Sequence, residues 1–322
     1  MSKGSRRGRR GPKRNYTPVI ILVLVVVLGV TAYYIFSGSG IGQTSPLINK
    51  PADPSVLNEL YNVSPSTLNS VGIGPSGLVA LQSTTSNGQT PSPLTLNGKP
   101  EILYIGAEYC PYCAAERWVM ITALDKFGNF TGIDYMQSAS SPEPYPNTST
   151  FTFVNANYTS NYISFVAIEQ KDRAENALMT PTSAEQALMN QYDSAGSIPF
   201  VDFANQYTLV GSQFVPQELR VGGSPTAAPL NWTDVASQVN SPSSVVAQNI
   251  DGATNRLIAA ICKIDGGQPV SVCNQTYAQA VAFIRNAPSN NSQLGVSETI
   301  LTGSPQSVVT GRFAPARLTT WV

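Results

Sequence analysis

The sequence contains no histidine and little charge. Of its 322 residues, 12% are Asp, Glu, Lys or Arg, which is about half the usual share in globular domains. Without histidine, a Ser–His or Cys–His catalytic pair and any metal site built on imidazole are excluded. The surface must draw its polarity from Ser, Thr, Asn and Gln. Such a surface suits a protein outside the cytoplasm, and it also suits an acidic medium, in which carboxylates lose their charge.

The few basic residues are unevenly distributed along the chain. Seven of the 19 lie within the first 14 positions, which contain no acidic residue. The remainder holds 12 basic and 19 acidic residues, a net charge of −7. An acidic body argues against nucleic acid as a partner, so we expect no nucleic-acid binding.

A basic tail, residues 1–17, precedes an apolar segment at residues 18–36 that contains the 18-residue uncharged run VIILVLVVVLGVTAYYIF. A run of this length can cross the hydrocarbon core of a bilayer as one helix. The preceding positive charges place the N-terminus in the cytoplasm. A cleaved signal peptide is the alternative, but its apolar core is usually shorter and ends at a small-x-small site, which we do not find. We expect a single-pass cell-membrane protein, anchored in lipid, with its main domain extracytoplasmic.

The extracytoplasmic part divides by composition. Residues 37–52 form a Gly- and Ser-containing linker, and residues 53–98 predict two short helices followed by a turn-rich loop. Residues 99–286 alternate between strand and helix patterns, which predicts one α/β domain. Residues 287–322 are rich in Ser, Asn, Gly and Pro and are treated as a C-terminal tail.

The segment KPEILYIGAEYCPYCAAERWVMITALDKFG, residues 99–128, carries the strongest functional signal. Its continuous apolar run at 102–105 predicts a strand covered on both faces. Pro111 fits the first turn of a following helix, and Gly128 fits the end of that helix. The run at 133–136 then predicts a second strand, parallel to the first, in a β-α-β unit.

Cys110 and Cys113 therefore lie at a helix N-terminus, where free N–H groups and the helix dipole stabilise a thiolate. We expect Cys110, at an exposed position, to attack and Cys113, buried one turn further, to resolve the mixed disulfide. A zinc site would need two more ligands from a chain without histidine, so we expect no metal. An inert structural disulfide remains the alternative.

Further elements follow from periodicity and turn signals. Strands are expected at 151–154 and 162–168, a helix broken at Thr180–Pro181 over 172–192, a β-hairpin with an Ala204–Asn205 turn over 197–211, and helices at 232–239, 245–264 and 276–286.

The strand, the Ala-Glu-aromatic-Cys turn, the helix and Ile198–Pro199 before a hairpin resemble the thioredoxin fold, and Cys-Pro-Tyr-Cys is typical of glutaredoxins. In that fold the proline before the hairpin is cis and lies beside the active cysteines. The resemblance implies a cis Ile198–Pro199 bond and a substrate groove formed by Ile198, Pro199 and Tyr112. Without the cysteines, Pro199 would be read as the start of an edge strand.

Two positions depart from thioredoxin. Tyr104 stands where thioredoxins carry a buried Asp, and Tyr109 stands where they carry Trp. Glu108 and Glu116 are nearby acids that either substitute for the Asp or lie in solvent. The missing acid favours an oxidase or isomerase over a strong reductant. The long spacing from Cys113 to Pro199 leaves room for an inserted helical segment at about 140–196, as in periplasmic disulfide oxidases.

A narrower resemblance rests on GKPEILYIGAEYCPYCAAERW and the Phe-Gly pair that follows it. These residues are similar to the membrane-anchored proteins of domain-of-unknown-function family 929. That resemblance implies fold and topology and supplies no activity.

Cys262 and Cys273 are expected to form a structural disulfide between the last helices, which an extracytoplasmic location permits. An electron relay with Cys110 and Cys113 is the alternative. Glycosylation is expected at several Asn-x-Ser/Thr sites. These sites are Asn62, Asn129, Asn147, Asn157, Asn231, Asn274 and Asn290.

Taken together, the sequence predicts an α/β protein with a thioredoxin-like fold, an inserted segment, C-terminal helices and one N-terminal transmembrane helix. The expected function is thiol–disulfide exchange on secreted or envelope proteins, with protein thiols or disulfides as substrate, no cofactor, and a membrane redox partner that resets the pair. The alternative is a non-catalytic binding or envelope-structural module with two structural disulfides.

Overall fold

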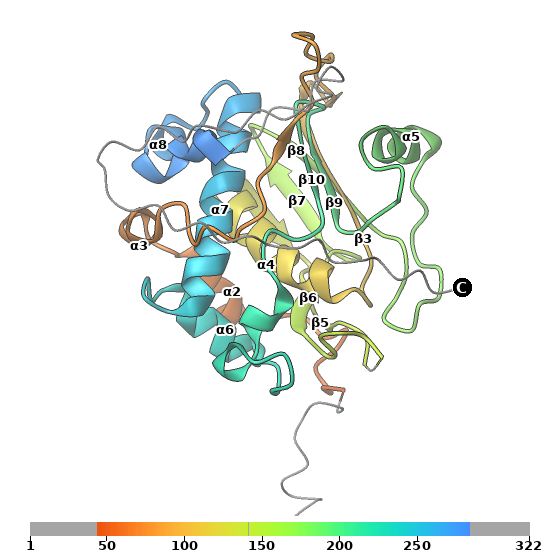
Figure 1. Cartoon of the computed structure of the whole chain (residues 1–322), viewed down its shortest axis with the longest axis vertical. Helices are drawn as coiled ribbons and strands as arrows, with labels where there is room; N and C mark the ends of the chain where they lie inside the picture. Colours follow the sequence, from red (N-terminus) through yellow and green to blue (C-terminus); the bar gives the residue numbers. More distant parts are fainter. Residues whose placement is uncertain (1–43, 141, 284–322) are drawn as a thin grey trace, which may run out of the picture. The chain divides into compact units, whose positions relative to one another are not determined.

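The computed structural model describes residues 44–140 and 142–283, which form a mixed α/β fold (Figure 1). The predicted tail, the anchor at 18–36 and the C-terminal tail at 287–322 lie outside the described residues. Within the described ranges, no helix is long and apolar enough to span a membrane.

The main sheet is built around β3 (Lys99–Gly106), which the sequence predicts as a buried strand. Its parallel neighbour is β8 (Ser164–Glu169), and its antiparallel neighbour is β9 (Phe200–Phe203). The sheet continues through β10 (Tyr207–Val210) to β1 (Gln82–Ser83), while β2 (Thr95–Leu96) pairs with β3. The main sheet therefore contains the strand order β10-β9-β3-β8. The chain passes from β3 to its parallel neighbour β8 by a long crossover that contains α4.

The predicted β-α-β unit is wrong in its second strand. β5 (Asp134–Gln137) pairs antiparallel with β6 (Ser149–Thr152) in a separate two-stranded sheet. All eight residues of β5 and β6 are buried. The apolar run at 133–136 therefore looks like a strand of the main sheet, and its residues do not show which sheet the strand joins. A second small sheet pairs β4 (Gly128–Thr131) with β7 (Asn157–Ser160).

Helices cover both faces of the main sheet (Figure 1). On one face lie α4 (Pro111–Leu124) and α7 (Val245–Ile264), with Ile102 and Tyr104 in their shared core. On the other lies α5 (Ser183–Tyr192), whose Met189 packs with Leu103 and Ile105. Consecutive residues of β3 thus point to opposite faces, and both faces are buried.

Shorter helices complete the fold. The sequence predicts two short helices in this region, and the structure has them as α2 (Pro54–Tyr61) and α3 (Pro65–Val71). Each begins at proline after a side-chain cap, Asp53 for α2 and Ser64 for α3. The remaining helices are α6 (Trp232–Val239), α8 (Val270–Cys273), and the 3₁₀ segments η1 (Pro216–Leu219), η2 (Val221–Gly223) and η3 (Thr276–Phe283). The bounds predicted for α6 and α7 are confirmed, whereas the last predicted helix is a 3₁₀ segment.

Gly128 does not end α4. The helix ends at Leu124, and its C-cap Asp125 has helical backbone angles. Gly128 instead opens β4, where a side chain would collide with the carbonyl oxygen of Thr159 on β7. Close approach of two strands, and not a left-handed helix cap, therefore explains this glycine.

The helical insertion expected at about 140–196 is also wrong. The described residues of this range hold β6, β7 and β8 and a single helix, α5, and β8 belongs to the main sheet. The first part of the helix predicted over 172–192 is also wrong, because residues 172–182 are not helical. At its start, the Asp172 carboxylate accepts backbone N–H groups from Ala174 and Asn176, which closes a turn. The capping box of Thr182 and Glu185 then starts α5.

The hairpin of β9 and β10 is confirmed. Ala204 and Asn205 at its turn have φ values of 54° and 57°, and Asp202 accepts the Asn205 N–H at 2.7 Å. The Ile198–Pro199 bond that leads into β9 is cis, as expected.

Candidate functional site

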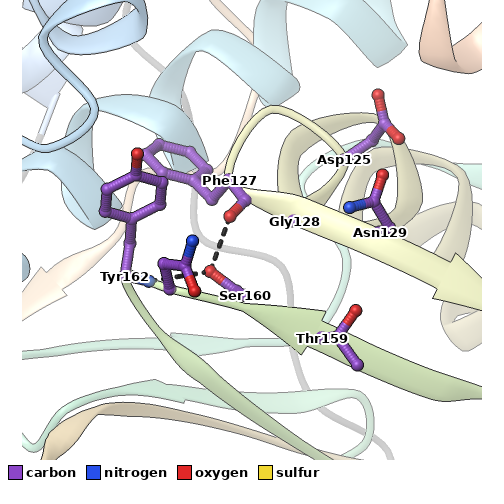
Figure 2. Close-up of a pocket in the computed structure, with 8 residues that line it drawn as sticks. Asp125, Phe127, Gly128, Asn129, Thr159, Ser160 and Tyr162 are labelled. Atoms are coloured by element: carbon purple, nitrogen blue, oxygen red, sulfur yellow. Dashed lines mark hydrogen bonds between the residues drawn. The ribbon is translucent and has the colours of Figure 1, made fainter.

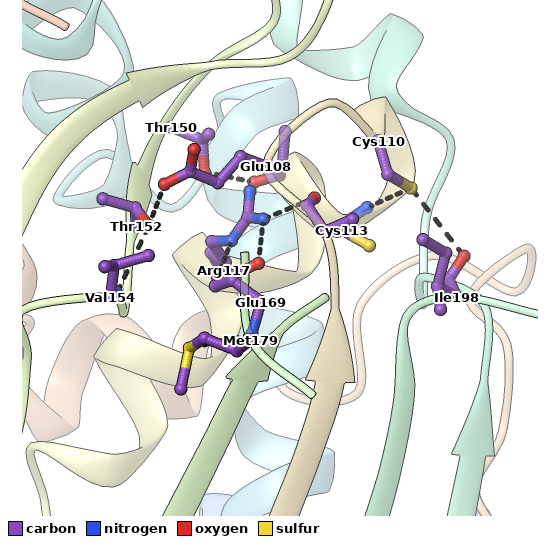
Figure 3. A network of polar contacts seen from close by, with 12 residues as sticks. Glu108, Cys110, Cys113, Arg117, Thr150, Thr152, Val154, Glu169, Met179 and Ile198 are labelled. Atoms are coloured by element: carbon purple, nitrogen blue, oxygen red, sulfur yellow. Dashed lines mark hydrogen bonds and ion pairs between the residues drawn. The ribbon is translucent and has the colours of Figure 1, made fainter. Parts of the chain in front are cut away.

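Cys110 is the N-cap of α4, with extended backbone angles (φ −75°, ψ 121°), and Pro111 occupies the first helical turn. The Cys110 sulfur accepts the backbone N–H of Cys113 at 3.2 Å (Figure 3). This N–H is one of the donors that a helix leaves unpaired at its start. A sulfur in this position is well placed to carry negative charge.

The two thiols have opposite electrostatic environments. Cys110 and Cys113 are free cysteines in this structure. The pKa of Cys110 is lowered, first by its hydrogen bond with the Cys113 side chain, with further lowering by the Cys113 N–H and the Arg117 charge, against the effect of burial. Burial raises the pKa of Cys113 well above its ordinary value. The pair is thus divided into one thiol that ionises readily and one that stays protonated.

Cys110 is less open than the sequence suggests. Its exposed fraction is 5%, whereas that of Tyr112, two residues on, is 37%. The expected exposed position therefore belongs to Tyr112, whose ring meets the edge of Tyr145 with 6.0 Å between centroids.

The carbonyl oxygen of Ile198 lies 3.8 Å from the Cys110 sulfur (Figure 3). Pro199 is buried, and its own carbonyl accepts the N–H of Gly211 across the hairpin at 2.8 Å. The structure therefore brings the loop before β9 to the first turn of α4, 88 residues earlier in the chain.

Arg117 and Glu169 are functional candidates that the sequence did not reveal. The Arg117 and Glu169 side chains are fully buried and paired at 2.7 Å. Arg117 also donates to the carbonyl of Ala107 at 2.6 Å. The sequence shows only that an arginine follows Cys113 by one helical turn. It does not reveal the ion pair, because the partner Glu169 lies 52 residues away on β8.

Glu108 and Glu116 are not solvated surface residues either. Glu108 is buried and accepts the hydroxyl of Thr152 at 2.6 Å, and burial raises its pKa. Glu116 is fully buried, and burial raises its pKa to about 8. One of its oxygens accepts the N–H of Gln213 at 2.9 Å.

Cys262 and Cys273 are joined by a disulfide, with a Cα–Cα distance of 5.5 Å. It links the last turn of α7 to α8. These two cysteines are therefore bonded to each other, while Cys110 and Cys113 lie together at the start of α4.

The glycosylation candidates differ in exposure. Asn62, Asn129, Asn157, Asn231 and Asn274 are exposed. Asn147 is fully buried, and its side-chain oxygen accepts a hydrogen bond from Arg173 at 2.6 Å, so this site is wrong for the folded protein. Asn290 lies outside the described residues.

A polar cavity of about 420 Å³ opens beside β4 and β7 (Figure 2). Asp125, Asn129, Ser160 and Tyr162 are among the residues that line it, and burial raises the pKa of Asp125 to about 6. No cysteine lines this cavity. Across residues 44–140 and 142–283, no group of three or more Cys, Asp or Glu side chains is arranged to hold a metal ion.

Comparison with known proteins gives one match. No curated protein and no solved structure matches the chain. The model of one family matches residues 87–263, which is more than half of the 322 residues and includes Cys110, Cys113 and Ile198–Pro199. The chain therefore belongs to the family described as Domain of unknown function (DUF929).

Proposed function

We propose that this protein is a membrane-anchored, extracytoplasmic thiol–disulfide oxidoreductase that acts as an oxidase or isomerase on secreted or envelope proteins. The observation that carries the proposal is the division of labour between Cys110 and Cys113. The first has a lowered pKa and a sulfur held by the N–H of the second, which is fully buried with a raised pKa. Attacking and resolving cysteines need these two environments.

The proposal includes a thioredoxin-like fold for residues 99–286. Three features support it: the strand order β10-β9-β3-β8, the parallel pairing of β3 with β8, and a helix with two cysteines directly after β3. The contact of the Cys110 sulfur with the Ile198 carbonyl is a fourth. In this proposal, Ile198, Pro199 and Tyr112 form the walls of the substrate groove.

As an oxidase, the protein begins with Cys110 and Cys113 joined. A substrate thiolate attacks the Cys110 sulfur, the Cys110–Cys113 bond breaks, and its electron pair passes to the Cys113 sulfur, which then takes up a proton. A second substrate thiolate attacks the sulfur that is bonded to Cys110. The substrate leaves with a disulfide, Cys110 leaves as a thiolate, and two electrons remain on the protein as the dithiol.

A lowered pKa at Cys110 favours this direction. Stabilising a thiolate stabilises the reduced pair, and a dithiol–disulfide pair with a stable reduced form is an oxidant. The two electrons must then pass to a partner that carries a disulfide. Because the sequence predicts a membrane anchor, a membrane protein is the partner that this proposal expects.

The experiment is turnover by the full-length protein in detergent. A peptide with two thiols serves as substrate, and oxidised glutathione resets the protein. We expect catalysed disulfide formation that Cys110→Ser abolishes, while Cys113→Ser accumulates a mixed disulfide on Cys110. Equal rates for the wild type and Cys110→Ser would contradict the proposal.

A second candidate is a non-catalytic binding or envelope-structural module. It is favoured by one observation, the 5% exposure of Cys110, which restricts access to the sulfur. The reduction potential separates the two candidates. A structural pair lies below about −300 mV and a working oxidase well above it.

A further inference from the structure

Three polar side chains with no exposed surface lie under the Cys110–Cys113 turn. They are Tyr104 on β3, Arg117 on α4 and Glu169 on β8. Cys113 is equally buried. Buried polar groups are normally fully hydrogen-bonded, so any that are not require an explanation.

The backbone brings these groups to one end of the sheet. Tyr104 and Gly106 point to the same face of β3 because they are two residues apart. The Tyr104 hydroxyl lies over Gly106, where a side chain would collide with it. Gly106 in turn pairs with Glu169 in the parallel register. The Tyr104 hydroxyl therefore lies at the carboxyl end of β3, beside Glu169, which is paired with Arg117.

Arg117 follows Cys113 by four residues, so both lie on the same face of α4 (Figure 3). Two of its nitrogens are fixed, Nε and Nη2 on Glu169 at 2.8 and 2.7 Å. Its third, Nη1, has no hydrogen-bond partner among the described residues, and neither does the Tyr104 hydroxyl. Two buried donors are thus left over, on side chains whose electrostatics are linked to those of Cys113.

An unpaired buried donor destabilises the folded protein by about 1–3 kcal/mol, so two of them at one place point to an acceptor that exists only part of the time. A thiolate on Cys113 is such an acceptor. Burial is the main influence on the pKa of both Cys113 and Tyr104 and raises both. The Arg117 charge opposes this rise at both groups, and Cys113 adds to the rise at Tyr104.

We propose, on the basis of the function proposed above, that the Tyr104 hydroxyl and Nη1 of Arg117 are the hydrogen-bond donors for the Cys113 thiolate when exchange forms it. When a substrate thiolate breaks the Cys110–Cys113 bond, the electron pair arrives on a sulfur that water cannot reach. The two donors stabilise that charge until the sulfur is protonated. Glu169 positions Arg117 for this role.

The test is Tyr104→Phe, which removes one oxygen and leaves the ring in the core. With the full-length protein, reduced glutathione reduces the Cys110–Cys113 disulfide, and the rate is followed by quenched-flow trapping. A hydrogen bond to a charged group contributes about 1.5–3 kcal/mol, so we expect the rate to fall about tenfold or more. Glutathione attacks the Cys110 sulfur, but the rate falls because the Cys113 thiolate that leaves has lost a hydrogen-bond donor.

The equilibrium constant for reduction of the Cys110–Cys113 disulfide by glutathione at pH 7 distinguishes this role from a purely structural one. Cys113 is a neutral thiol in the reduced protein, because burial raises its pKa. The donors therefore act on the passing thiolate and not on either end state. We expect a slower rate in both directions and an unchanged equilibrium constant.

Tyr61→Phe is the matched control. The Tyr61 hydroxyl is also buried without a hydrogen-bond partner among the described residues, but it lies on α2. It should leave the rate unchanged. A Tyr104→Phe rate equal to that of the wild type, or an equal loss in Tyr61→Phe, overturns the inference and leaves the proposed function intact. A wild-type disulfide that glutathione does not reduce overturns the proposed function itself.

Discussion

Arg117 and Glu169 form a two-bonded ion pair between α4 and β8, with both side chains fully buried. The residues are 52 positions apart in the sequence. The pair ties the helix that starts at Cys110 to the strand that lies parallel to β3. It is therefore a tertiary link next to the cysteines. Burial is the main cause of the raised pKa of Cys113, and the charges of the pair act on it in opposite directions, with Arg117 lowering the pKa and Glu169 raising it.

Breaking this pair should be strongly destabilising. We expect Glu169→Gln to lower the free energy of unfolding by about 3–5 kcal/mol, because it leaves a buried guanidinium without its counter-charge. Urea unfolding followed by circular dichroism measures this. Lys171→Gln is the control, because Lys171 and Glu175 form a half-exposed pair at 4.0 Å that is worth less than about 1 kcal/mol.

Gly106 should not accept a side chain. Gly106→Ala places a methyl group against the Tyr104 ring and hydroxyl in a packed core, and overpacking of this kind destabilises by about 1–3 kcal/mol. Gly77→Ala is the matched control, because nothing lies within 4 Å of the new methyl group there. Equal unfolding midpoints for the two variants would contradict the placement of Tyr104.

Stability should fall as the pH rises from about 5 to 8. Burial raises the pKa of Glu116 to about 8, of Asp251 to about 8 and of Asp202 to about 7. The folded state then holds protons that the unfolded state releases near pH 4, so each step upward in pH favours unfolding until the folded pKa is passed. The stability contributed by the neutral acids is fully present below the unfolded pKa.

Glu116→Gln should flatten part of this slope. One pKa unit corresponds to about 1.4 kcal/mol, so the variant should gain stability over the wild type on the order of a few kcal/mol between pH 5 and 8. Urea midpoints over this pH range test it. A wild type that becomes more stable toward pH 8 would show that these carboxyls are ionised in the fold.

Asn147 should carry no glycan, in contrast to the exposed sites. Its side-chain oxygen is engaged by Arg173 inside the protein, whereas Asn129 and Asn157 are exposed. Site-resolved mass spectrometry of protein from a glycosylating host should find occupancy only at exposed positions. A glycan on Asn147 in folded protein would contradict its burial.

Local signals predicted the elements that local chemistry determines. The sequence predicts the two short helices after residue 53, the Ala204–Asn205 turn and the long helix at 245–264 from the residues at those positions. The structure has all of them. The cysteine turn was readable for the same reason. The four residues from Cys110 to Cys113 are enough to predict two cysteines at the start of a helix.

Pairings between distant segments were not readable. The run at 133–136 looks like any buried strand, and nothing local distinguishes a partner in the main sheet from one in a small separate sheet. The residues around Arg117 in the sequence do not indicate that it is buried, because its counter-charge comes from Glu169 on β8. Gly128 looked like a helix cap, although the constraint comes from the backbone at Thr159.

The central claim is that Cys110 is an activated thiol. Its most direct measurement is the rate of iodoacetamide alkylation of Cys110 in the reduced full-length protein between pH 4 and 10, read by mass spectrometry of the peptide. We predict a midpoint clearly below that of a free cysteine, which is about 8.5, with Cys113 unreactive over the same range. A Cys110 midpoint at or above about 8.5 would contradict the account.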